Sequence, residues 1–249
     1  MTTLLIALVV GFAVSVLAFV CTTVYLHRAL AHRGVTLAPS VQWVFRVLTW
    51  ITTGIRPRQW VAVHRKHHAF TGEEGDPHPA ELVGWKRVQV MNVAMYRREA
   101  KNPITLARYA KDIPEDKWDR RLFNHAWLGL SIGVAFLVVV FGPVIGLLAA
   151  FVHVNIYLGG SAAVNAVGHH FGRRPYDNTA GNLHWLALIT AGEGFHNNHH
   201  AVPTSPRLSH HWYQFDLGWQ VIRGLRALGL ATLREPALAR IRSTPRRAA

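Results

Sequence analysis

Residues 126–168 read AWLGLSIGVAFLVVVFGPVIGLLAAFVHVNIYLGGSAAVNAVG and contain no Lys, Arg, Asp or Glu. This run is long enough for two membrane-spanning helices, and Gly142-Pro143 marks a turn between them. Arginine pairs flank the run on both sides, at 120–121 and 173–174. Because positive charge favours the cytoplasmic side of a membrane, both ends of this predicted hairpin face the cytoplasm. The expected spans are about 126–141 and 144–168.

Residues 4–26 form another uncharged segment that is long enough to cross a bilayer. No Lys or Arg precedes it and no small-residue cleavage site follows it, so we expect a retained span instead of a cleaved signal peptide. Arg28 and Arg33 follow this span, which places the N-terminus outside the cell. The stretch 38–55 is apolar apart from Arg46 and contains two tryptophans. This pattern predicts an interfacial helix, with a full span as the alternative.

Composition supports a single membrane domain over residues 1–249. Half of the 249 residues (50%) are hydrophobic, and 27 Lys and Arg against 13 Asp and Glu give a formal net charge of +14. The charge suits anionic lipid or a substrate phosphate, and the spans leave too little soluble fold for a nucleic-acid binder. We therefore expect an all-α integral membrane protein with three, or four, transmembrane helices and a cytoplasmic helical cap formed by 56–121 and 171–235. The basic tail, 240–249, is expected to be frayed.

Eight of the 16 histidines lie in three short motifs, which are His27-Arg-Ala-Leu-Ala-His32, His64-Arg-Lys-His67-His68 and His196-Asn-Asn-His199-His200. On a helix, HxxHH places its three imidazoles on one face. In HRALAH the spacing of five turns the two rings about 140° apart on an ideal helix, and they could still meet one cavity if the helix frays where it leaves the membrane. The chain has one cysteine, so imidazole must supply most metal ligands. Eight histidines exceed what one ion takes, which favours two metal ions.

Acidic residues near the motifs have a different expected role. Soluble di-iron bundles use two Glu-x-x-His motifs, and this chain has the pattern once, at Glu193 to His196. A ferritin-like carboxylate site is therefore disfavoured, and we expect Glu193 to orient a histidine ligand. Single histidines such as His78 and His170 are interpreted as packing or surface residues.

Further stretches accompany the motifs: Gly75-Asp-Pro-His78, Asn165-Ala-Val-Gly-His169 and Arg174-Pro-Tyr-Asp177. Together they resemble the three histidine boxes of membrane fatty-acyl desaturases of the stearoyl-CoA desaturase type, over residues 10 to about 230. The resemblance implies a two-iron centre with a tenth position, Asn165, that holds a metal through water. The implied histidine ligands are His27, His32, His64, His67, His68, His169, His196, His199 and His200.

The same resemblance implies a substrate and a reaction. Trp60 and Ser161 would lie at the bend of an acyl tunnel, and Ser15 and Phe19 at its end. Such enzymes use two iron ions to activate O2 and remove two hydrogens from a saturated acyl chain, commonly at carbons 9 and 10. The expected localisation is a bacterial cell membrane, among membrane lipids, with the active site on the cytoplasmic face.

Three departures from animal members of this family leave details open. The chain has one span fewer before the first motif. Ala62 and Val63 stand where animal members have Arg-Asp in contact with CoA, so the fatty-acyl substrate could be a CoA ester or a lipid. No haem, flavin, nicotinamide or iron–sulfur motif is present, so electrons are expected from a separate donor of the ferredoxin, cytochrome b5 or flavin reductase type.

Two alternatives compete with a desaturase. One is a lipid hydroxylase or ketolase of the same histidine-box superfamily, because the same metal centre can insert oxygen. The other is a non-catalytic metal-handling membrane protein, such as a carrier or sensor. A carrier is expected to place its ligands within its spans, whereas these motifs lie at the ends of the spans, which favours an enzyme.

Overall fold

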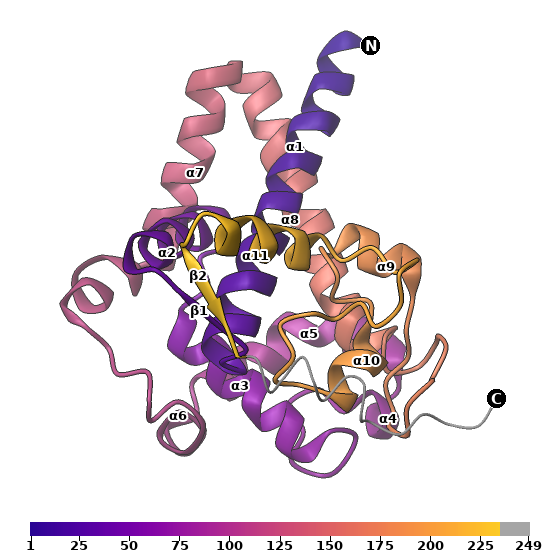
Figure 1. Ribbon diagram of the computed structural model, residues 1–249. Coiled ribbons are helices and arrows are strands. Elements are labelled where there is room, and N and C mark those ends of the chain that lie inside the picture. The colour runs from indigo at the N-terminus through magenta and orange to yellow at the C-terminus, as the bar shows by residue number, and fades with distance from the viewer. Residues whose placement is uncertain (235–249) are drawn as a thin grey trace.

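Three apolar helices project together from one side of the molecule in this computed structural model, which describes residues 1–234 (Figure 1). They are α1 (Thr2–Val20), α7 (Ala126–Phe141) and α8 (Pro143–Ala166). Large hydrophobic side chains such as Val9, Phe12 and Val139 are exposed on them. Outward-facing apolar side chains on helices of this length are typical of lipid contact.

The continuous helix Thr2–Ala31 and α8 are each long and apolar enough to cross a membrane, and α7 is a shorter apolar helix. The helices pack closely at two glycines. A side chain at Gly11 would meet Val152 on α8, and one at Gly146 would meet the backbone of Val138 on α7. The predicted turn at Gly142 has a positive φ of 80°, which glycine adopts without strain.

The remaining elements form a compact body beneath the three helices (Figure 1). Its larger helices are α2 (Pro39–Thr53), α3 (Pro57–Phe70), α5 (Trp85–Ala100) and α11 (Leu217–Ala227). Its short helices are α4 (Ala80–Val83), α6 (Pro103–Tyr109), η2 (Asp119–Phe123), α9 (His184–Ile189) and α10 (His196–Ala201). Strands β1 (Val35–Leu37) and β2 (Ala231–Leu233) pair antiparallel, a pairing that the sequence did not predict.

The two histidines of HRALAH reach the same cavity without fraying of the helix. The first helix continues past Val20 as a π-helix, η1 (Cys21–Ala31), and the amide of His32 donates to the carbonyl of His27 at 3.0 Å. A π-helix bonds residues five apart, so the two histidines come to the same side of the helix. Arg33, at a positive φ of 53°, follows directly after this turn.

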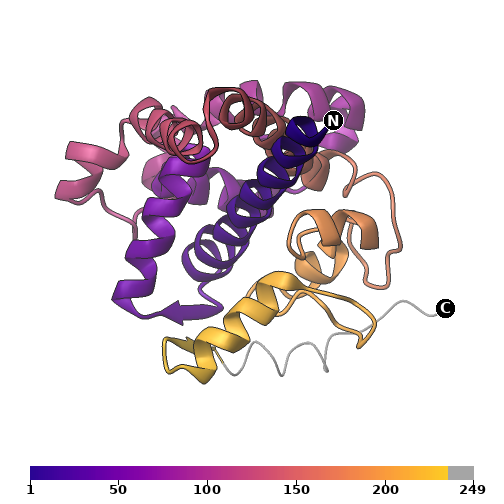
Figure 2. The ribbon, with the colours of Figure 1, turned by 90° about the horizontal axis from the view of Figure 1, so that it is seen from above.

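Helices α2 and α11 lie across the direction of α1, and Figure 2 shows both at nearly full length. Helix α2 agrees with the predicted helix at 38–55. Its one charged residue, Arg46, is 13% exposed, pairs with Asp116 and Asp119 and lies 4.3 Å above the ring of Phe123. These contacts explain how an arginine is accommodated within an otherwise apolar stretch.

Candidate metal centre

Nine histidines converge into two adjoining clusters at the base of the apolar helices. The first cluster consists of His27, His32, His64, His68 and His199, and the second of His67, His169, His196 and His200. Within each cluster the candidate ligand atoms all lie within 4.8 Å of one another. The structure thus brings together every histidine that the resemblance implied.

The spacing between ring nitrogens fits a coordinated metal. In the first cluster the Nε2 atoms of His32 and His64 are 2.8 Å apart, and those of His27 and His199 are 3.0 Å apart. In the second, the Nε2 atoms of His169 and His196 are 3.0 Å apart. Ligands about 2.1 Å from one ion at right angles are separated by about 3 Å, so these distances match the edges of a coordination shell.

Burial keeps the imidazoles in the neutral form that can bind a metal ion. Their removal from water, reinforced by repulsion from neighbouring histidines, lowers the pKa of seven of them well below 6.5. The seven are His32, His64, His67, His68, His196, His199 and His200. They are therefore neutral at neutral pH, and neutral imidazole is the form that binds metal. The Nε2 atom of His67 is buried without a hydrogen-bond partner, which fits a role as a metal ligand.

Glu193 supports the first cluster from behind. Its carboxylate accepts a hydrogen bond from Nδ1 of His27 at 2.7 Å and another from the hydroxyl of Thr23. Burial raises the pKa of Glu193, but contact with His27 and the nearby charge of Arg28 outweigh it, and the net pKa is lowered. A carboxylate on Nδ1 fixes the ring and leaves Nε2 facing the cluster.

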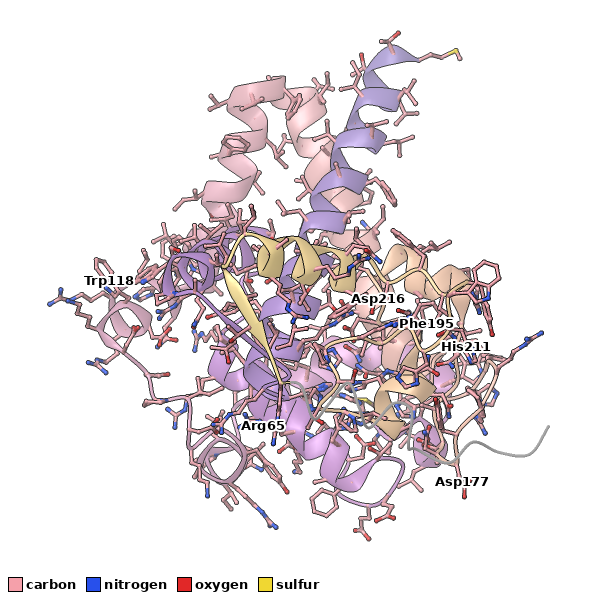
Figure 3. All side chains as sticks on the ribbon, viewed as in Figure 1. Arg65, Trp118, Asp177, Phe195, His211 and Asp216 are labelled. Atoms are coloured by element: carbon pink, nitrogen blue, oxygen red, sulfur yellow. The ribbon has the colours of Figure 1, made fainter. Side chains whose placement is uncertain are left out.

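Arg28 connects this support to the C-terminal part of the body. Its guanidinium, 1% exposed, donates to Thr23, to the carbonyl of Pro206 and, through two nitrogens, to Asp216 at 2.8 and 3.1 Å. Asp216 is fully buried and also accepts from the amide of Trp219 at the start of α11. Figure 3 labels Asp216 beneath α11.

Arg65 fixes the first and second motifs relative to each other. From its place on α3, labelled in Figure 3, it donates to the carbonyls of Leu30 and Ala31 at 2.9 Å. These carbonyls lie at the end of η1, where they have no helical partner. Arg65, within the HRKHH motif, therefore hydrogen-bonds to the end of the HRALAH segment.

The second cluster has two carboxylates behind it. Asp76 accepts from Nδ1 of His67 at 3.0 Å, and burial raises its pKa. Glu81 lies 3.3 Å from Nδ1 of His169, and this contact lowers its pKa although burial opposes the shift. Sequence reasoning missed Glu81, because a single glutamate on a four-residue helix has no pattern.

His78 was also missed as a site residue. It is 6% exposed, and its ring centroid lies 4.6 Å from that of His67. His67, Asp76 and His78 form a third group within ligand distance of one another. The Asp-Pro-His stretch was the signal that could have placed His78 at the centre.

The two asparagines of the third motif hold it in place. Asn197 and Asn198 are fully buried. The side-chain amide of Asn197 donates to the carbonyls of Tyr176 and Ala180, and that of Asn198 donates to the carbonyl of Leu208. Because α10 has only six residues and so short a helix is marginal alone, these hydrogen bonds keep its histidines in position.

A cavity of about 100 Å³ opens beside both clusters. Its lining includes Phe19, Trp60, His64, Ser161, Asn165 and His196. Trp60 stacks on His64 at 4.7 Å, and the ring of Phe19, which also lines the cavity, lies 5.0 Å from that of Tyr157. Ser15 does not line this cavity: its hydroxyl donates to the carbonyl of Gly11 and lies 3.1 Å from Nδ1 of His153.

The fold and the site define a class: a mostly helical protein with helices long and apolar enough to cross a membrane and with two histidine clusters that could hold metal ions. The family model for fatty acid desaturase matches residues 3–236, and the chain belongs to that family. It is therefore an oxidoreductase of lipid metabolism.

Three relatives illustrate the similarity. The chain is 32% identical to the Delta-9 desaturase-like 2 protein of Arabidopsis thaliana, over 89% of this chain and 74% of that protein. It is 31% identical to the sn-1 stearoyl-lipid 9-desaturase of Synechocystis sp., over 84% of this chain and 65% of that protein. It is 30% identical to a hex-5-enoyl-[acyl-carrier protein] acetylenase of Moorena producens, over 86% and 72%.

Proposed function

We propose that the protein introduces a cis double bond between carbons 9 and 10 of a saturated acyl chain carried on an intact lipid. The observation that carries the proposal is the pair of histidine clusters around one cavity. Relatives named as Delta-9 and stearoyl-lipid 9-desaturases support the bond position and the lipid carrier. Ala62 and Val63 also favour a lipid, because they are buried, apolar and unable to contact a CoA headgroup.

Two iron ions fit the two clusters, because imidazole suits iron and the nitrogen spacing matches a coordination shell. When bound, the iron pair would supply the activation of O2. The histidines of each cluster would hold one ion, and Asn165, which lines the cavity, would hold a water against the second cluster. The body would then lie on the cytoplasmic face of a bacterial membrane.

The chain's own residues would hold and orient the substrate. The acyl chain would enter the cavity beside Trp60 and Ser161, with its far end limited by Phe19. Burial of the cavity walls excludes water from the reacting carbons. Three carboxylates would fix the rings of the histidines that they contact: Glu193 the ring of His27, Asp76 that of His67, and Glu81 that of His169.

Expression in a host that lacks its own desaturase tests the function. We expect monounsaturated lipids that require O2, with the double bond located by fragmentation of derivatised acyl chains. Hydroxylated lipids without unsaturation would contradict the proposal. Changing both His67 and His199 to alanine takes one ligand from each cluster, so full iron content in that variant would contradict the ligand assignment.

A further inference from the structure

A surface that the proposed reaction does not use lies over His169. We call it the Trp85 surface, and it consists of Leu82, Trp85, Lys86, His170, Phe171 and Arg174. The Trp85 ring lies 6.0 Å from that of His170 and 5.4 Å from that of Phe171. The ammonium of Lys86 lies 5.9 Å from the Trp85 ring. Arg174 donates to the carbonyl of His169, the residue before His170, at 3.3 Å, and Leu82 lies on α4, which directly precedes Trp85 in the chain.

The patch combines exposed apolar and basic groups. Leu82 is 59% exposed and Phe171 is 45% exposed, while Lys86, His170 and Arg174 are also exposed. Exposed apolar side chains beside polar or charged groups are typical of a surface that binds another protein or a membrane. Helix α4 lies at the end of the molecule opposite the tips of the apolar helices, so a water-soluble partner could reach it (Figure 1).

The patch also leads directly to the metal centre. His170 is joined by one peptide bond to His169, whose Nε2 lies 3.0 Å from that of His196 in the second cluster. The stacked rings of Trp85 and His170 therefore connect an exposed surface with a candidate ligand. His170, which adjoins a ligand but does not itself enter either cluster, gains a function in this arrangement.

The proposed reaction needs such a connection. Converting –CH2–CH2– to –CH=CH– removes two electrons and two protons, whereas reducing O2 to two waters takes four of each. Two electrons and two protons must therefore come from elsewhere. The protons can come from water, but the electrons require a reduced carrier.

We propose that the Trp85 surface is the docking site of an acidic, one-electron carrier protein, which binds twice per turnover. This proposal rests on the proposed function. The positive side chains on the patch and the net charge of +14 would attract a partner of opposite charge. Redox encounters of this kind use small interfaces, below about 1,200 Å² in total, and the Trp85 surface would form the centre of one.

The test measures electron transfer separately from desaturation. The iron-loaded protein is mixed anaerobically with a reduced, acidic [2Fe–2S] ferredoxin, and ferredoxin oxidation is followed by stopped-flow absorbance. We expect Lys86→Glu to lower the second-order rate roughly tenfold at low salt, with the difference shrinking as salt screens the charges. Arg108→Glu is the matched control, because Arg108 is an exposed arginine on α6, away from the patch. Dithionite, which needs no docking site, should reduce all three proteins equally.

Equal ferredoxin rates for the wild type and Lys86→Glu would overturn the proposal, as would reduction of the wild type by dithionite but not by ferredoxin. The patch could instead bind lipid headgroups. In that case Lys86→Glu would raise KM for substrate in phosphatidylglycerol vesicles and leave the ferredoxin rate unchanged, which would also overturn it. Ferredoxin rates that differ as expected, in a protein that forms no unsaturated lipid, would support the docking site and contradict the proposed function.

Discussion

Neutralising Asp216 should destabilise the protein far more than neutralising an exposed acid. The Arg28–Asp216 pair is almost fully buried, and two hydrogen bonds join its members. Asp216→Asn keeps the size of the side chain but leaves the Arg28 charge without its directly bonded counter-ion. Breaking a buried pair in this way costs about 3–5 kcal/mol. For a chain of this size, that corresponds to a fall in Tm on the order of 10 °C.

The packing around the pair gives little room for relief. A side chain at Gly192 would meet the carboxylate of Asp216, and one at Gly218 would meet the guanidinium of Arg28, so both partners are closely packed against neighbouring backbone. The assay is thermal unfolding of detergent-solubilised protein. Asp116→Asn is the control, because Asp116 pairs with Arg46 but is 48% exposed, and such pairs contribute about 1 kcal/mol or less. A Tm for Asp216→Asn within about 2 °C of the wild type would refute the reasoning.

Other predictions concern the metal centre and the cavity. As pH falls below 6.5, metal analysis should show release of iron, and unfolding measurements should show a less stable apoprotein. The reason is that the clustered histidines have lowered pKa values in the folded protein, so the unfolded chain binds more protons than the folded one. Glu81→Gln should weaken iron binding about 10–100-fold in chelator competition, while Glu74→Gln on the exposed loop should not. Phe19→Ala should shift the lipid products towards longer acyl chains in mass spectra, because Phe19 lines the cavity and loss of its ring would enlarge it. An unchanged profile would contradict the proposal that Phe19 limits the far end of the acyl chain.

Much of the architecture could be predicted from local patterns. Uncharged runs determine the positions of α1, α7 and α8, because only apolar side chains are stable in lipid. The HxxHH spacing correctly predicted shared faces on α3 and α10. The π-helix at HRALAH could not be predicted, because hydrophobic periodicity assumes a regular α-helix. Nor could Glu81, whose contact with His169 joins residues far apart in sequence and depends on tertiary packing.

The supports behind the two clusters differ, and this difference has a measurable consequence. The first cluster has five histidines and one supporting carboxylate, Glu193. The second has four histidines and two supporting carboxylates, Asp76 and Glu81. A carboxylate on Nδ1 makes an imidazole a stronger donor, and one histidine fewer leaves room for water or another small ligand. Two ions held in these sites should therefore differ in coordination number and in electron density.

Mössbauer spectra of isotopically enriched, iron-loaded protein should show two quadrupole doublets of equal area. Glu81→Gln should shift only one of them, because Glu81 contacts a histidine of the second cluster alone. Glu193→Gln should shift the other, through His27. A single doublet in the wild type, or a shift of both doublets by either substitution, would show that the two sites are not independently supported. The asymmetry matters for the reaction, because the site with four histidines would be the one that takes the water held by Asn165, which lines the cavity.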